Sequence, residues 1–313
     1  MVGFYRNQPT AEWPDIKIIG SMPFMQETFC TRLIESLRSR SEKTAMRIVG
    51  DETEVYTFGD LLRGINSIAI GLDKQGIAPG DRVALIGENH PSWAIAYLGI
   101  IYRGGVCVPL DPHGEIETLT NFLENSEARL AFIDDRFNEK FKSIGQRLGR
   151  NLPAVVWKTD AAGNCPAQPE NSEGFQDFAD WTREYSAEEF NEIRGQPQYC
   201  DTALLMYTSG TTGTPKGVPL THGNIIAELD GINEVLKISE NERILSLLPL
   251  FHAYLQIVNL WVATTLGCEV GYLKELSPAE LGEAMKSFKP TILTTVPRLW
   301  YLFHKKIFDA VKG

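Results

Sequence analysis

Hydrophobic residues follow two spacings that alternate along most of this chain. Short apolar runs, such as RVALIG at 82–87 and VCVPL at 106–110, are typical of buried strands. Between these runs, from Pro91 to Gly104, apolar residues recur at helical spacing, with proline and glycine where a helix begins and ends. A strand, a helix and a second strand in this order predict a crossover unit of parallel strands.

The same alternation continues beyond this unit. Helices are predicted to begin near Thr57, Ile116, Gly223 and, with a capping box to Glu280, at Ser277. Further strands are predicted at 130–134, 154–157, 203–207, 244–248, 269–272 and 291–295. Residues 157–201 are rich in Asn, Gln, Pro, Gly and acidic residues, so we expect a surface excursion there, with one exposed helix over 187–194. The whole pattern predicts an α/β fold with largely parallel sheets.

Composition and charge narrow the class of protein. The 313 residues are 43% hydrophobic and 22% charged, which is typical of a globular chain. A net charge of −10 argues against a nucleic-acid partner, since such surfaces carry an excess of clustered basic residues. The 5 cysteines are scattered without CxxC spacing, so neither a disulfide framework nor a zinc site is indicated. The sequence shows no signal-peptide pattern and no membrane-spanning apolar stretch, so we expect a reduced, cytoplasmic compartment.

The segment YTSGTTGTPKGV at 207–218 carries the strongest chemical signal. It follows an apolar strand, its glycines let the backbone approach a ligand, and its hydroxyls and lysine can contact an anion. It is not the P-loop of NTPases, because Pro215 precedes Lys216 and Gly217 follows it. A solvated turn is the plainer alternative, but this concentration of polar groups after a strand favours phosphate binding. The candidate phosphate-binding residues are Thr208, Ser209, Gly210, Thr211, Thr212, Gly213, Thr214, Pro215 and Lys216.

This segment resembles the phosphate-binding signature of the adenylate-forming superfamily, which includes acyl-CoA synthetases, firefly-type luciferases and peptide-synthetase adenylation domains. Residues 76–112 are similar to the family's early core, and LPLFHAY at 248–254 resembles its acyl-site motif. KPTILTTVPRLWYLF at 289–303 is similar to the long-chain acyl-CoA synthetase form of the next segment. The resemblance covers nearly all of the chain and favours long acyl chains within the superfamily.

The resemblance implies a fold of two side-by-side, largely parallel sheets flanked by helices. It places residues 76–240, with the phosphate-binding segment, in a first α/β subdomain. Residues 20–75 and 241–313 would form a second α/β subdomain that carries the acyl site and is incomplete relative to the family.

The resemblance also implies a reaction. The family activates a carboxylic acid, here a fatty acid, with ATP and Mg²⁺ to an acyl-adenylate, from which coenzyme A then displaces AMP. Lys216 would be catalytic because it offsets charge on the departing pyrophosphate, and Thr208 would place its hydroxyl near Mg²⁺. His252 would be catalytic beside the reacting carboxylate. The implied substrate-binding residues are Phe251, His252, Tyr254, Gln256, Val296 and Pro297.

Two kinds of alternative stay open at this point. The plainer alternative for His252 and the aromatic residues near it is that they belong to the core. For the whole chain, the family is considerably longer, so we expect the N-terminal part of a ligase that needs the missing C-terminal portion and is inactive alone. The alternatives are one half of a split ligase and a non-catalytic acyl- or nucleotide-binding remnant. A lipid substrate also predicts peripheral contact with a membrane.

Overall fold

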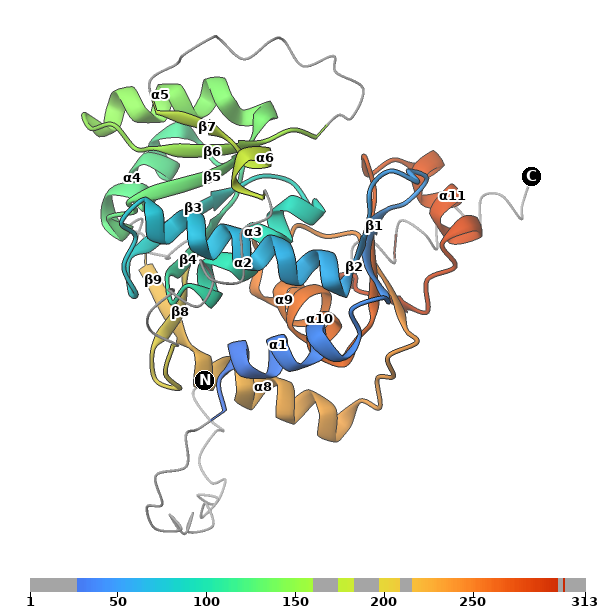
Figure 1. Ribbon diagram of the computed structural model, residues 1–313. Helices are drawn as coiled ribbons and strands as arrows, with labels where there is room; N and C mark the ends of the chain where they lie inside the picture. Colours follow the sequence, from blue (N-terminus) through green and yellow to red (C-terminus); the bar gives the residue numbers. More distant parts are fainter. Residues whose placement is uncertain (1–26, 160–173, 183–196, 209–215, 298–300, 302–313) are drawn as a thin grey trace, which may run out of the picture.

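The computed structural model describes residues 27–159, 174–182, 197–208, 216–297 and 301. Within these residues the chain forms two β-sheets, with helices between them and on their outer faces (Figure 1). The predicted α/β class, with two largely parallel sheets flanked by helices, is therefore confirmed. In the part of the chain that is described, no helix combines the length and apolar character needed to cross a membrane.

The larger sheet has seven strands among the described residues, and neighbouring strands are parallel except at one edge, where β9 runs antiparallel to β8. The central strands are apolar and buried, as expected for a parallel sheet that is covered by helices on both faces. The parallel strands, β8 included, end at the same edge of the sheet. In sheet order they are β7 (Phe175–Asp177), β6 (Ala154–Trp157), β5 (Leu130–Asp134), β3 (Arg82–Ile86), β4 (Val106–Leu110), β8 (Thr202–Thr208) and β9 (Lys216–Thr221).

The smaller sheet has five strands among the described residues and is also parallel except for one edge pair, β1 and β2. Its strands lie within 44–57 and 243–293, whereas those of the larger sheet lie within 82–221. The division into subdomains at 76–240 and at 20–75 with 241–313 stays a prediction. In sheet order the strands are β12 (Ile292–Leu293), β10 (Arg243–Ser246), β11 (Glu269–Tyr272), β1 (Thr44–Ile48) and β2 (Val55–Thr57).

Two helices, α2 (Phe58–Lys74) and α3 (Pro91–Tyr102), pack against each other between the two sheets (Figure 1). Every residue of α3 is buried, which explains why this helix is apolar on all sides. Glycine allows the two helices to cross closely, because a Cβ on Gly99 would lie 2.6 Å from the side chain of Ile68. The helix pair thus joins residues of both sheets into one hydrophobic core.

Other helices cover the outer faces of the sheets (Figure 1). On the larger sheet these are α4 (Ile116–Ser126) and α5 (Asn138–Leu148), the latter preceded by the short η1 (Asp135–Phe137). On the smaller sheet, α11 (Pro278–Ser287) packs against the strand residues that face away from α2 and α3. The remaining helices pack against one another on the lower side of the view: α1 (Phe29–Ser39), α8 (His222–Val235), α9 (Ala253–Gln256), the π-helical η2 (Ile257–Val262) and α10 (Ala263–Leu266).

The expectation of a pure surface excursion over 157–201 is wrong for its described part. This region contains strand β7 and the short helix α6 (Phe178–Trp181), whose two terminal aromatic residues are buried. The ring of Trp181 meets that of Phe132 edge-on at a centroid distance of 5.4 Å. A few aromatic residues therefore fix a segment that is otherwise polar. The helix expected over 187–194 lies outside the described residues.

Smaller departures concern single elements. Strand β9 was not expected, and the strand expected over 291–295 is reduced to Ile292–Leu293. At α2 the capping box forms in both directions between Thr57 and Asp60. At α11 the hydroxyl of Ser277 accepts the N–H of Glu280 at 3.2 Å, without a reciprocal bond among the described contacts.

Candidate active site

Strands β8 and β9 form a hairpin at the edge of the larger sheet, and the predicted phosphate-binding segment connects them (Figure 1). Thr208 and Lys216 are directly paired where the ladder ends, and both are exposed. Among the described residues, no acidic side chain pairs with Lys216. The hairpin therefore places a hydroxyl and an ammonium group opposite each other at the carboxyl edge of the sheet. The candidates Ser209, Gly210, Thr211, Thr212, Gly213, Thr214 and Pro215 lie outside the described residues.

At its base the hairpin meets α8 beside a buried histidine. Thr221 caps the helix, since its hydroxyl accepts the N–H of Asn224 at 3.1 Å. His222 follows with 0% exposure, and neither ring nitrogen has a hydrogen-bond partner among the described residues. Burial lowers the pKa of His222 to about 4, against a weaker opposite effect of Asp201. The ring is thus a neutral packing group at the foot of the hairpin.

The predicted acyl-site motif forms a turn between β10 and α9, which we call the His252 turn (residues 247–252). The carbonyl of Pro249 accepts the N–H of His252 at 3.2 Å, and the buried side chain of Leu250 anchors the turn. His252 itself is exposed at the N-cap of α9, with its ring centroid 4.2 Å from that of Phe251. Its exposure rules out the alternative of a core histidine and leaves its ring accessible to a ligand.

Gln256 lies below this turn in a chain of buried hydrogen bonds. Its side chain is 0% exposed, and its Oε1 accepts the hydroxyl of Tyr97 at 3.0 Å. The Tyr97 oxygen in turn accepts Nε1–H of Trp261 at 2.8 Å. Nε2 of Gln256 donates to the carbonyl of Phe251 at 3.3 Å and lies 3.7 Å from Sδ of Met206 in β8. The network therefore connects the hairpin strand to the residue before His252.

The other predicted substrate-binding residues lie at the surface near the ends of the smaller sheet. Tyr254 is 50% exposed and Val296 is 40% exposed, and Pro297 is exposed as well. Phe251 is half-buried beside His252. Exposed apolar groups of this kind fit a binding wall better than a core, and their contact with an acyl chain stays a prediction.

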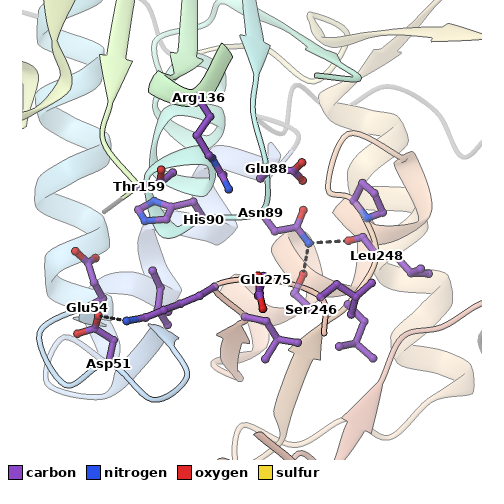
Figure 2. A pocket seen from close by; sticks show the side chains of 16 residues that line it. Asp51, Glu54, Glu88, Asn89, His90, Arg136, Thr159, Ser246, Leu248 and Glu275 are labelled. Carbon is purple, nitrogen blue, oxygen red and sulfur yellow. Dashed lines mark hydrogen bonds and ion pairs between the residues drawn. The ribbon is translucent and has the colours of Figure 1, made fainter. Parts of the chain in front are cut away.

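Sequence reasoning did not single out Asn89, which links the two sheets directly. Its Nδ2 donates to the carbonyl of Leu248 at 2.7 Å and to Oγ of Ser246 at 3.2 Å (Figure 2). Its Oδ1 accepts the N–H of Leu250 at 2.8 Å. Ser246 also accepts from buried Asn259 at 2.8 Å. The available signal was a polar side chain three residues after a buried parallel strand, at the sheet edge where ligand sites are common.

A groove of about 660 Å³ opens between the carboxyl ends of the two sheets, with Asn89 between its walls (Figure 2). Its two cations are engaged: Nζ of Lys274 lies 3.0 Å from Oδ2 of Asp51, and Nε of Arg136 donates to Oδ1 of Asp134 at 2.9 Å. Burial lowers the pKa of His90 to about 4, so this ring is neutral as well. The groove wall thus carries more carboxylates than cations, with Asn89 as its amide side chain.

The described residues fit a phosphate group better than a complete metal site. They contain no cluster of three or more His, Cys, Asp or Glu side chains that could hold a metal ion. Thr208 supplies one exposed hydroxyl and Lys216 one exposed ammonium group. A lysine beside a hydroxyl suits an anion, whereas Mg²⁺ needs several oxygen ligands, commonly including phosphate oxygens of the nucleotide. Binding of a nucleotide phosphate by these residues, and of its Mg²⁺ by Thr208, stays a prediction.

Known enzymes are similar in sequence to this chain over most of its length. A family model described as AMP-binding enzyme matches residues 33–311. The 4-coumarate–CoA ligase 3 of Arabidopsis thaliana is 30% identical over 290 residues, which cover 91% of this chain and 48% of that protein. The long-chain-fatty-acid–CoA ligase of Bacillus subtilis (strain 168) is 27% identical over 305 residues, or 93% of this chain and 54% of that protein. The chain thus spans about half the length of these curated relatives.

A solved structure shares the fold as well. The anthranilate CoA ligase AuaEII, in complex with anthranoyl-AMP, superposes with a TM-score of 0.73 and 25% identity. The superposition covers 86% of this chain and 49% of that one. The two sheets and their flanking helices are therefore an arrangement that this anthranilate CoA ligase also has.

Proposed function

Because this chain belongs to the family of AMP-binding enzymes, we propose that it carries the triphosphate- and acid-binding part of a ligase that activates a fatty acid. A carboxylate oxygen attacks the α-phosphorus of ATP and pyrophosphate leaves. The thiol sulfur of coenzyme A then attacks the acyl carbon of the adenylate, and AMP leaves. Both steps bring negatively charged or electron-rich groups together, so positioning and charge compensation are the main tasks of the protein.

The direct pairing of Thr208 with Lys216 is the observation that supports this proposal most. It brings the two ends of the predicted phosphate-binding segment side by side, and both of these side chains are exposed. The Lys216 ammonium group would contact the β- and γ-phosphates and offset the charge that develops on the leaving pyrophosphate. Bound Mg²⁺ would supply further compensation of phosphate charge, with the Thr208 hydroxyl as one of its neighbours.

The His252 turn would hold the other reactant. An exposed imidazole beside the half-buried ring of Phe251 can donate a hydrogen bond to a carboxylate while the aromatic ring contacts the start of an acyl chain. Tyr254, Val296 and Pro297 would extend this wall, with Gln256 below it. The contact between Gln256 and Met206 connects this wall to the strand that leads to Thr208.

Two acid classes compete at this site. The form of residues 289–303 favours a long-chain fatty acid, and the Bacillus subtilis relative is named for that substrate. The Arabidopsis thaliana relative, named for 4-coumarate, has the higher identity and favours an aromatic acid. We propose the fatty acid, with the aromatic acid as the second candidate.

The remaining half of the relatives has no counterpart in this chain. We propose that such a portion completes the ATP site and that the activity is low without it. If the chain is instead one half of a split ligase, its activity would likewise depend on the other half.

Acid-dependent exchange of labelled pyrophosphate into ATP tests the proposal. The chain would be assayed alone and together with a polypeptide that covers the remaining half of the relatives, using fatty acids of increasing length, 4-coumarate and anthranilate. We expect exchange with long fatty acids once both polypeptides are present and little with the chain alone. Mixtures without acid give the background.

Each other outcome identifies a different error. Exchange that is strongest with 4-coumarate would assign the aromatic class instead. Robust exchange by the chain alone would contradict the need for a second portion. Binding of MgATP without exchange in any mixture would favour the non-catalytic, nucleotide-binding alternative.

A further inference from the structure

Asn89 joins the larger sheet to the smaller one through three hydrogen bonds, one to the end of β10 and two to the His252 turn (Figure 2). It follows β3, while its partners Ser246, Leu248 and Leu250 follow or end β10. Two of the bonds involve main-chain groups on either side of Pro249. A single side chain from the opposite sheet thus binds the main chain on both sides of Pro249, at the start of the turn.

The amide chemistry of Asn89 matches these partners. Its NH₂ group donates to the Leu248 carbonyl and the Ser246 hydroxyl, and its oxygen accepts the Leu250 N–H. An aspartate would keep the acceptor but would set a carboxylate against the Leu248 carbonyl. Alanine would leave both main-chain groups of the turn without this partner. Glutamine carries the same amide group, but its longer side chain would place it differently.

Residues 248–250, which Asn89 contacts, lie directly before Phe251 and His252 in the chain. The carbonyl of Pro249, which lies between the two contacts of Asn89, accepts the His252 N–H at 3.2 Å. Leu250 is buried, whereas the His252 side chain is exposed and makes no cap hydrogen bond to α9. The ring direction of His252 therefore depends on the main chain of the turn, because the described contacts give its side chain no hydrogen-bond partner of its own.

We propose that Asn89 is a positioning residue, which fixes the His252 turn so that the imidazole faces the reacting acid. This inference rests on the proposed function of His252, and the geometry of the turn can be tested apart from it. A displacement of about 1 Å at a reacting group can cost roughly 100-fold in rate. Through its hydrogen bonds at the start of the turn, Asn89 therefore affects catalysis without any contact to the substrate.

The first test measures the turn itself. In Asn89→Ala we expect exchange of the Leu250 amide hydrogen to rise by at least about tenfold, since its acceptor is lost. The ring signal of His252 in a ¹H–¹³C spectrum, identified by its absence in His252→Gln, should shift. Ser246→Ala is the control: it removes the Ser246 hydroxyl, which accepts from Asn89 and from Asn259, and it keeps the contacts of Asn89 to the main chain of Leu248 and Leu250.

The outcomes separate positioning from a general structural role. A folded Asn89→Ala with the wild-type Leu250 exchange rate and His252 ring signal would overturn the proposal. An equal change in Ser246→Ala would also overturn it, since the turn contacts remain there. If Asn89→Ala does not fold, Asn89→Asp keeps the acceptor for Leu250 and loses the donors; its His252 signal must then shift for the proposal to stand.

The second test concerns the reaction. In the acid-dependent exchange assay, Asn89→Ala should lower kcat by about 10- to 100-fold with little change in KM for ATP. A rise in the KM for ATP with an unchanged kcat would contradict a role in positioning the group beside the reacting acid. Failure of the wild type to show exchange would refute the proposed function, while the amide exchange and ring signal still decide whether Asn89 positions His252.

Discussion

The hairpin of β8 and β9 and the His252 turn both follow a parallel strand, but the protein holds them in different ways. At the mouth of the hairpin, the described contacts are main-chain pairs between exposed residues, Thr208 and Lys216. The His252 turn is held by side chains, with Asn89 at its start and Gln256 behind it. The first region is attached by its base, and the second is fixed along its length.

This difference fits the two tasks that we propose for them. A triphosphate is long and highly charged, and an exposed lysine can contact it from several positions. A carboxylate that must attack one phosphorus atom needs a neighbour in one place, and such a neighbour is best held by a rigid, hydrogen-bonded support. The contrast also predicts that substitutions around the turn lower stability, whereas those at the hairpin mouth mainly lower ligand affinity.

The largest effect on stability is expected from Tyr97→Phe. The missing hydroxyl would leave Oε1 of Gln256 and Nε1 of Trp261 buried without their partners. Each buried unsatisfied group costs roughly 1–3 kcal/mol, so we expect the free energy of unfolding to fall by about 3 kcal/mol. Chemical denaturation measures this quantity. A loss below about 1 kcal/mol would mean that the network does not hold the turn as strongly as its geometry indicates.

The second effect concerns acid and the base of the hairpin. Burial lowers the folded-state pKa of His222 to about 4, below the ordinary value of 6.5. The folded protein therefore favours the neutral ring. The contribution of this ring to the free energy of unfolding is present above pH 6.5 and is lost as the pH falls toward 4. Between about pH 7 and 5, the free energy of unfolding should fall by about 2 kcal/mol through His222 alone.

His222→Leu isolates that contribution, because leucine fills a buried apolar site and binds no proton. The variant should lose less stability than the wild type between about pH 7 and 5, by the same amount of about 2 kcal/mol. His90 is present in both proteins and cancels in the comparison. Parallel pH curves for the two proteins would show that His222 is not the acid-sensitive group of the hairpin base.

Much of the fold, and part of the candidate site, could be predicted from the sequence. Strands β4, β5 and β6 and helix α3 were predictable because apolar runs and the residues at their ends are local signals. Thr208 and Lys216 were singled out as candidates from the residues that follow one apolar strand, and their role stays a prediction. Local sequence patterns are enough to predict an element whose structure is determined mainly by its own residues.

The rest depended on contacts that no local pattern contains. Asn89 meets Leu248 across 159 sequence positions, and the pairing exists only because α2 and α3 bring the two sheets together. Phe178 and Trp181 were missed for a similar reason, since their partners lie on β5 and β6 and their neighbours in sequence are polar. The side chains that support a site were therefore harder to predict than those at its surface.

The third effect should appear in ligand binding and not in stability. Lys216→Ala removes an exposed ammonium group, and we expect the Kd for MgATP to rise at least about tenfold. The free energy of unfolding should change by less than ~0.5 kcal/mol, as for other exposed lysines. Lys237→Ala is a matched control, because Lys237 is also exposed and lies beyond α8. Titration calorimetry and thermal denaturation together decide whether Lys216 acts on the nucleotide or on the fold.

The smallest effect provides the strictest test of the contrast. Tyr207→Phe, on the hairpin strand, removes a hydroxyl that donates to the exposed Oδ1 of Asn125 at 2.6 Å. Water can replace the lost hydroxyl, and the new ring keeps the stack on Phe122, which has a centroid distance of 4.4 Å. We therefore expect a loss below ~0.5 kcal/mol, against the much larger loss for the same change at Tyr97. Equal losses in the two Tyr→Phe variants, measured by chemical denaturation, would show that hairpin and turn are held alike.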